Sequence, residues 1–426
     1  MRGANSPPPQ SGGSPPASVR AWTFPARFRA RAFGWKGTAP ASQRMKEALT
    51  EIKAVQRKDP VLAADGAVRL IERIVPAIQD IDGSSGAIGT AVTRTVNALV
   101  DIIAAAPAPL KVRAAWLDRL WDAYNEDGYG YLDQLPDRWG DLCASLELSN
   151  SWADSLAPTL RHSFAERSRM RGSSAALSCL QAAGRYAEIV EIVALLQYEF
   201  WGYQRFAVQA LVGLGRPEEA LRYAESRTNP NDSGQAAAAC ERILRDLGRR
   251  DEAYRRYGLH AHRASTNLTT FRSLSKAYPE IAPSKLLSDL VASTPGEEGK
   301  WFATAKDLEL YDDAIDVANR SPCDPKTLIR AARDFEQSEP MFALKAALTA
   351  LHWLCAGHGY DLVGNEAYQA FDHALRAAEQ AGDRDGALKA MATLVDPALG
   401  ATNWAGDYLR RLLASAPSVT SPIRKE

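Results

Sequence analysis

Residues 214–220 read Leu214-Gly215-Arg216-Pro217-Glu218-Glu219-Ala220, and closely related stretches lie 31 residues earlier and 33 residues later. The earlier copy is Ala183-Gly184-Arg185-Tyr186-Ala187-Glu188-Ile189, and the later copy is Leu247-Gly248-Arg249-Arg250-Asp251-Glu252-Ala253. Glycine accepts the left-handed backbone that ends one helix, and acidic residues favour the N-terminus of the next. A small alanine five residues after the glycine lets the two helices approach closely, although Ile189 takes that place in the first copy. The stretch therefore predicts pairs of antiparallel helices.

Two later copies extend the pattern toward the C-terminus: Glu309-Leu310-Tyr311-Asp312-Asp313-Ala314 and Ala381-Gly382-Asp383-Arg384-Asp385-Gly386-Ala387. Glu309 stands in the glycine's place, and the intervals of 61 and 73 residues are each about two repeats. A period near 34 with this turn resembles tetratricopeptide repeats, although the large aromatic residue expected early in the first helix is often missing. Generic HEAT-like helix pairs are the alternative for residues 170–395.

The rest of the chain also shows helical spacing from residue 41 onward, with almost no strand alternation. Short loops between long helices indicate antiparallel neighbours. We therefore expect an all-α protein, an α-solenoid of antiparallel helix pairs with an irregular N-terminal arm. The predicted segments are a disordered tail at 1–20, a basic and aromatic arm at 21–40, a HEAT-like or capping helical region at 41–169, tetratricopeptide-like repeats at 170–415 and a flexible tail at 416–426.

The composition describes a folded, charge-balanced chain. Of 426 residues, 46% are hydrophobic and 24% charged, with 51 basic and 51 acidic residues. Residues 1–46 nevertheless hold eight basic residues and no acidic one, which leaves 43 basic against 51 acidic in the remainder. The five dispersed cysteines favour reduced thiols in a reducing compartment. No apolar run approaches the ~18 residues that span a bilayer, so we expect a cytoplasmic protein without a membrane span.

Three stretches resemble an uncharacterised bacterial protein family. They are residues 24–36 (FPARFRARAFGWK), 84–92 (SSGAIGTAV) and 293–302 (STPGEEGKWF). The resemblance covers most of the chain after residue 20. It implies a bacterial cytoplasmic protein with helical repeats, and it transfers no catalytic residue.

Several local patterns suggest chemistry, and each has a structural alternative. The loop 83–90 could hold a phosphate but lacks the Lys-Ser/Thr of a P-loop, so its serines are expected to cap the next helix. In 294–301 we expect Thr294 to cap a helix and Trp301 to fill the core. His352, Cys355 and His358 invite a zinc hypothesis without an evident fourth ligand, His260 and His262 are a weaker pair, and 125–130 fails the calcium-loop register. With no catalytic motif found, we expect no enzyme activity, cofactor or metal.

The basic arm permits two main interpretations. Basic and aromatic residues are interleaved along it. The basic residues are Arg27, Arg29, Arg31 and Lys36, and the aromatic residues are Trp22, Phe24, Phe28, Phe33 and Trp35. Basic side chains contact phosphates and aromatic rings stack on bases, so the arm could bind nucleic acid. The preferred interpretation is that the aromatic rings dock the arm onto the acidic helical body. A membrane-surface role is the third alternative.

The first helices of tetratricopeptide pairs line a groove, and placing each turn at the repeat position predicts its lining residues. These are Arg205, Gln209, Arg242, Arg245, Lys306 and Arg376. The set is basic, which suggests a groove for an acidic peptide. A solvated helix face with local ion pairs is the alternative. The expected function is a non-enzymatic intracellular scaffold that binds a protein partner, with a nucleic-acid-associated repeat protein as the competing hypothesis.

Overall fold

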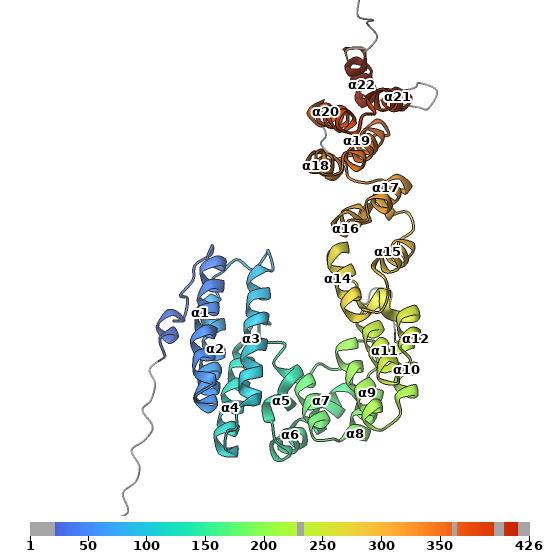
Figure 1. Ribbon diagram of the computed structural model, residues 1–426. Helices are drawn as coiled ribbons and strands as arrows, with labels where there is room; N and C mark the ends of the chain where they lie inside the picture. Colours follow the sequence, from blue (N-terminus) through green and yellow to red (C-terminus); the bar gives the residue numbers. More distant parts are fainter. Residues whose placement is uncertain (1–21, 228–233, 360–363, 396–403, 416–426) are drawn as a thin grey trace, which may run out of the picture. The chain divides into compact units, whose positions relative to one another are not determined.

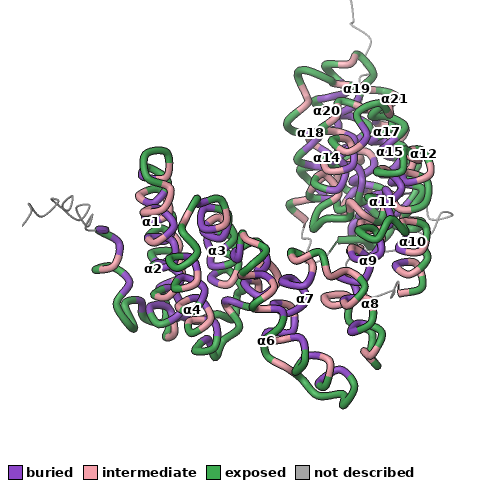
Figure 2. The backbone as a smooth tube through the Cα atoms, turned by 90° about the horizontal axis from the view of Figure 1, so that it is seen from below, coloured by how far each residue is buried: buried purple, intermediate pink, exposed green. Residues whose placement is uncertain are grey.

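The computed structural model describes residues 22–227, 234–359, 364–395 and 404–415, and within these ranges it contains helices and no strand. The predicted all-α class is confirmed. The helices fall into two compact units, one within residues 1–227 and one within 228–426. Figure 1 labels the helices, and Figure 2 shows buried and exposed positions alternating along them. The tails predicted at 1–20 and 416–426 lie outside the described residues.

Unit 1 begins with the arm and continues through helices that pack on their neighbours in sequence, while α1 contacts α3, α2 contacts α4 and α7 contacts α9. Its elements are η1 (Phe24–Arg27), α1 (Thr38–Gln56), α2 (Pro60–Ile78), α3 (Ala87–Ala105), α4 (Leu110–Glu126), η2 (Pro136–Arg138), α5 (Trp139–Cys143), α6 (Leu146–Ala165), α7 (Ser173–Ala182), α8 (Tyr186–Ala194), α9 (Trp201–Gly213) and α10 (Pro217–Glu225).

Unit 2 repeats this arrangement, with α17 against α19, α18 against α20 and α19 against α21. Its elements are α11 (Gln235–Asp246), α12 (Arg250–Ala253), the π-helix η3 (Tyr254–Gly258), α13 (Leu259–Ala261), α14 (Asn267–Ala277), α15 (Pro283–Ala292), η4 (Glu298–Trp301), α16 (Phe302–Asp307), α17 (Tyr311–Arg320), α18 (Pro325–Phe335), α19 (Pro340–Cys355), α20 (Gly364–Ala381), α21 (Arg384–Leu394) and α22 (Trp404–Ser415).

The recurring turn has the backbone that its sequence predicts. Its glycines have φ between 72° and 75°, and Glu309, which replaces glycine, has φ 60°. The next residue donates its amide to a carbonyl five positions back, at 2.8–3.0 Å in every copy. This is the Schellman closure of a helix C-terminus. In three copies the arginine after the glycine also pairs with a glutamate three residues on, as in Arg249–Glu252 at 2.7 Å. The residue five positions after the turn is buried in all five copies: Ile189, Ala220, Ala253, Ala314 and Ala387.

The long intervals between the later copies are also explained. Helices α14 and α15 form a pair before Glu309, and α18 and α19 form a pair before Gly382. Neither pair has the turn glycine. Proline instead begins the second helix, at Pro283 and Pro340. Because proline fixes φ and has no amide hydrogen, it is well suited to the first helical turn.

A close helix crossing joins the first helices of unit 1 to the repeats. Gly140 on α5 lies so near α7 that a β-carbon there would be 2.3 Å from the carbonyl oxygen of Ser178. The Gly140 amide also donates to the Ser178 hydroxyl at 2.9 Å. The segments predicted as 41–169 and 170–415 therefore pack together at α5 and α7, and the predicted repeat region runs through both units.

The statement that no apolar stretch reaches membrane-spanning length is wrong. Among the described residues, α3 is long and apolar enough to cross a membrane by length and composition, because Arg94 and Asp101 are its only charged residues. Its residues Val92, Val96 and Leu99 are buried in the core of unit 1. A core helix of a soluble protein passes the same test.

We expect the left-handed turn residue to control stability through its backbone alone. A β-carbon at Gly248 would meet nothing within 4 Å, so Gly248→Ala adds only the left-handed strain of an L-residue. It should destabilise the protein by about 1 kcal/mol. Conversely, Glu309→Gly should be more stable than Glu309→Ala by a similar amount, because alanine keeps the strain and glycine removes it. Urea unfolding followed by circular dichroism measures both. Equal stability of Glu309→Gly and Glu309→Ala would contradict this account.

Candidate functional site

A polar cleft of about 590 Å³ lies between α18 and α20 in unit 2. Basic side chains from both helices share it with a smaller number of carboxylates and with two side-chain amides. Its lining residues are Asp324, Lys326, Ile329, Arg330, Arg333, Asn365, Glu366, Gln369, Asp372, His373 and Arg376.

Local sequence explains why α18 presents a basic face. Asp324 accepts hydrogen bonds from the amides of Lys326 and Thr327 and so caps the helix that begins at Pro325. Leu328 and Ala332 are buried, whereas Lys326, Arg330 and Arg333 lie outward at steps of four and three residues. Residues at these steps share one side of a helix. The three cations therefore form one ridge along the cleft.

Arg330 is the cation of this ridge that forms no ion pair among the described residues. Its Nε donates to the carbonyl of Lys326 at 3.2 Å and its Nη2 to the hydroxyl of Thr327 at 3.0 Å. No carboxylate of the described ranges is paired with it, whereas Arg333 pairs with Asp334 at 2.8 Å. The guanidinium is thus oriented by its own helix and keeps donors for an external acceptor.

The facing helix α20 contributes a mixed surface. Arg376 pairs with Asp372 at 2.7 Å, and Lys326 reaches across the cleft to Glu366 at 3.8 Å. His373 contacts the carboxylate of Glu336 through Nδ1. Pairs at exposed positions contribute little to stability, so their cations are available for exchange onto an incoming anion. The cleft therefore brings cations from two helices together with carboxylates that pair with only some of them.

Only one of the predicted groove residues, Arg376, lies in this cleft. Arg245 pairs with Glu241 at 3.7 Å, Lys306 pairs with Asp307 at 2.7 Å, and Arg205 of unit 1 pairs with Asp137 at 2.8 Å. For these three residues, the local ion pairs of the alternative interpretation are observed. Arg242 is exposed and Gln209 is partly exposed.

Sequence reasoning missed Lys326, Arg330 and Arg333. They belong to the helix pair without a turn glycine, so the repeat alignment assigned them no position. The signal that could have found them is Asp324-Pro325 as a helix start, followed by cations at helical spacing.

The N-terminal arm is docked on unit 1. Trp22, Phe24, Phe28 and Phe33 are buried, and Trp22 packs so closely on α2 that a β-carbon at Gly66 would lie 2.4 Å from its ring. The amides of Arg31 and Phe33 donate to the carbonyls of Pro76 and Ala77 at the end of α2, at 2.8 and 3.3 Å.

The cations of the arm are only partly paired. Arg27 pairs with Glu47 at 2.7 Å and Arg31 lies 3.8 Å from Asp80. Arg29 and Lys36 are exposed, and of the aromatic residues proposed to stack on bases only Trp35 is exposed, at 66%. The docking interpretation therefore describes the arm, and four of its five rings are unavailable for base stacking.

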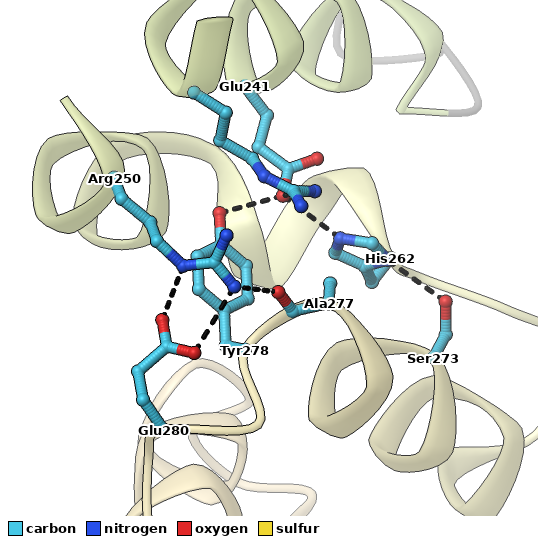
Figure 3. A network of polar contacts seen from close by, with 8 residues as sticks. Glu241, Arg250, His262, Ser273, Ala277, Tyr278 and Glu280 are labelled. Carbon is cyan, nitrogen blue, oxygen red and sulfur yellow. Dashed lines mark hydrogen bonds and ion pairs between the residues drawn. The ribbon is translucent and has the colours of Figure 1, made fainter. Parts of the chain in front are cut away.

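A buried network of polar side chains lies elsewhere in unit 2 (Figure 3). The carboxylate of Glu241 on α11 is 5% exposed, receives the hydroxyl of Tyr278 at 2.7 Å and lies 3.0 Å from Nε2 of His262. Nδ1 of His262 lies 2.9 Å from the hydroxyl of Ser273 on α14. Burial alone would raise the pKa of Glu241, but the hydrogen bonds of His262 and Tyr278 outweigh it and hold the pKa below its ordinary value.

Serine, histidine and carboxylate in hydrogen-bond sequence resemble a hydrolase triad, which sequence reasoning did not anticipate. The surroundings favour a structural role. Ser273 lies within the regular helix α14 rather than at a strained turn, and Glu241 is shared with Tyr278 and Arg245. Arg250 covers the Tyr278 ring at 5.1 Å and donates to the carbonyl of Ala277 and to Glu280, which closes the end of α14. The network thus joins α11 to α14 and to the segment that follows α13.

Two structural expectations for the other motifs need correction. In 83–90 the N-cap residue of α3 is Gly86, with φ 69°, rather than a serine, although the Ser85 hydroxyl accepts the amide of Ala87, the first residue of α3, at 3.4 Å. Thr294 does not cap a helix start: it follows α15 and accepts the indole hydrogen of Trp301 at 2.8 Å. Trp301 is buried, as predicted.

The remaining motifs are built into the helices and turns. Asp127 is buried and accepts the amides of Tyr129 and Leu132, so it organises the 125–130 turn. The Trp353 ring lies 4.8 and 5.1 Å from the His352 and His358 rings. No group of three or more His, Cys, Asp or Glu among the described positions is arranged to hold a metal ion.

No protein-family model matches the chain, and no curated protein matches it in sequence. The resemblance to an uncharacterised bacterial family therefore stays a prediction. The geometry of the clefts, surfaces and polar networks carries the functional argument.

The Glu241 network should make stability depend on pH in the acid range. Since the folded-state pKa of Glu241 is below its ordinary value of 4.5, its contribution is present above that pH and is lost as pH falls through the folded value. Glu241→Gln should cost about 1.5–3 kcal/mol near neutrality, the usual worth of hydrogen bonds to a charged group. The difference between wild type and variant should shrink as pH falls below 4.5 in urea titrations. A difference independent of pH would contradict the ionised network.

Proposed function

We propose that this protein is a non-enzymatic scaffold whose tetratricopeptide-like solenoid of helix pairs binds an acidic segment of a protein partner in the cleft between α18 and α20. The support for the solenoid is the recurrence of the left-handed turn and the contact of alternate helices within each unit. The absence of recognised catalytic motifs in the sequence supports a binding role over a catalytic one.

The observation that carries the proposal is the set of contacts that Arg330 makes. Its helix orients the guanidinium through Lys326 and Thr327, yet none of the described carboxylates pairs with it. Arginine binds carboxylates through two parallel hydrogen bonds, so an oriented, uncommitted guanidinium is suited to an incoming acidic side chain. Arg333 and Arg376 lie beside it in the same cleft and can accept further carboxylates.

A peptide fits the cleft better than a nucleic acid. Asp324, Glu366 and Asp372 line it together with the cations, and they would repel a continuous row of phosphates. The side-chain amides of Asn365 and Gln369 offer both donors and acceptors, which match the backbone of an extended peptide. Separate carboxylates on a polar backbone therefore satisfy the cleft with the fewest unfavourable contacts.

The cytoplasm is the proposed compartment. All five cysteines are buried thiols outside any disulfide, and burial raises the pKa values of Cys323 and Cys355, to about 12 and about 11. Protonated buried thiols behave as small apolar side chains, which suits a reducing environment. The bacterial origin and family membership implied by the sequence resemblance belong to the same proposal.

Charge reversal at Arg330 tests this function. A fluorescently labelled Glu/Asp-rich peptide should bind the full-length protein, and Arg330→Glu should weaken binding by about 10- to 100-fold, the equivalent of losing one charge-assisted hydrogen bond. Arg255→Glu, an exposed site on η3 of the same unit, is the matched control and should bind like wild type. Fluorescence anisotropy measures the dissociation constants, and binding should weaken as salt rises.

Two outcomes would contradict the proposed function. One is equal weakening by Arg330→Glu and Arg255→Glu, which would indicate a response to net charge alone. The other is equal binding of the acidic peptide and a peptide with glutamine and asparagine at the acidic positions, which would show that the carboxylates are not recognised.

A further inference from the structure

Two neighbouring loops of unit 1 place arginine beside exposed aromatic rings. The first, residues 166–172, joins α6 to α7, and the second, residues 195–200, joins α8 to α9. Nε of Arg167 donates to the side-chain oxygen of Gln197, whose amide donates to the carbonyl of Ala165 at 3.3 Å. These hydrogen bonds hold the loops together as one surface.

The aromatic rings of this surface are exposed to solvent, and neighbouring side chains pack beneath them. Tyr198 is 43% exposed and Phe200 is 50% exposed. The ring of Phe200 meets Tyr203 edge to face at 4.9 Å, and Tyr203 lies 5.2 Å from the buried Phe164. A β-carbon at Gly202 would lie 2.5 Å from the Phe200 ring, so glycine there allows the ring its position. An exposed ring held in one orientation, as Phe200 is, loses little conformational entropy on stacking with a ligand.

Two of the cations beside these rings form no ion pair among the described residues, although Nε of Arg167 is hydrogen-bonded to Gln197. Arg167 and Arg169 are exposed, and neither pairs with a carboxylate of the described chain. Arg171 fixes the loop instead, because it donates to the carbonyls of Tyr124 and Asp127 at the end of α4. Of the nearby acids, Glu199 lies 3.9 Å from Arg227 and is partly neutralised.

The backbone at Arg167 gives a separate indication. Arg167 has φ 55°, the left-handed conformation that ends α6, and the Ser168 amide donates to the Ser163 carbonyl at 2.9 Å to close the turn. Glycine takes the corresponding position after α7, α9, α11 and α20. Arginine at this position has backbone strain that glycine would not have, and its side chain links the two loops through Gln197.

We propose that the loops 166–172 and 195–200 bind single-stranded nucleic acid, with bases stacked on Tyr198 and Phe200 and phosphates held by Arg167 and Arg169. Exposed rings interleaved with arginine are the features of sequence-tolerant single-strand binding. The lining of the α18–α20 cleft has arginines but no Phe, Tyr or Trp, and it includes carboxylates and amides. This activity is separate from peptide binding, and its chemistry was expected of the arm, where four of the five rings are buried.

The test uses the full-length protein and a fluorescently labelled single strand of mixed sequence, about 12 nucleotides long, which lies within the usual site size. Phe200→Ala should weaken binding by about 5- to 150-fold, the equivalent of losing one stacked base. Arg167→Gly should also weaken binding while the melting temperature stays equal or rises, because glycine relieves the left-handed strain. Arg330→Glu is the control and should leave binding to the single strand unchanged.

Binding of the labelled strand that Phe200→Ala and Arg167→Gly leave unchanged would overturn the proposal, as would no binding at low salt or equal binding of a blunt duplex. Capture of the acidic peptide at this surface, measured as its loss in Arg167→Gly but not in Arg330→Glu, would assign the loops to a protein ligand instead. The proposals for the two sites can therefore be contradicted independently of each other.

Discussion

Five of the helix pairs depend on one backbone constraint, the single left-handed residue that ends the first helix of the pair. That residue directs the following amide back to a carbonyl five positions earlier, and the second helix starts one residue later. The direction of the second helix is then set by local geometry. Burial of a small residue five positions on, such as Ala220 or Ala253, lets the two helices pack closely. Glu309 shows that the conformation rather than the glycine is required.

Because each pair is closed locally, the outer face of its first helix is free to vary. Along α18 that face carries cations at successive turns, and α20 faces it with carboxylates and amides. The Glu241 network shows the opposite use of such a face. There an arginine, a histidine and a tyrosine converge on one buried carboxylate, and the polar groups satisfy each other instead of a ligand. The difference between the two places is burial, because an ion pair withdrawn from water is costly to break.

Helix pairing and the turn conformation could be predicted from the sequence because both depend on residues close in the chain, such as Gly215 and Ala220. The binding residues could not be predicted in the same way. Arg376 was found by repeat alignment, but Lys326, Arg330 and Arg333 lie in a pair whose turn lacks the glycine and whose second helix begins at Pro340. Arg245 has groove spacing, and its partner Glu241 lies one turn earlier on the same helix. Tyr278, which shares that carboxylate, is brought there by tertiary packing. The composition of the arm permitted both docking, which we preferred, and nucleic-acid binding, and the burial of Trp22 and Phe28 agrees with docking.

We propose that an acidic peptide binds to the scaffold in the cleft between α18 and α20. Hydrogen–deuterium exchange of the full-length protein, with and without a Glu/Asp-rich peptide, tests this most directly because it locates the contact without altering the protein. We expect the peptide to slow amide exchange in α18 and α20 and to leave exchange in α1–α4 unchanged. Protection spread evenly over the basic residues of both units, or confined to helices other than α18 and α20, would contradict it.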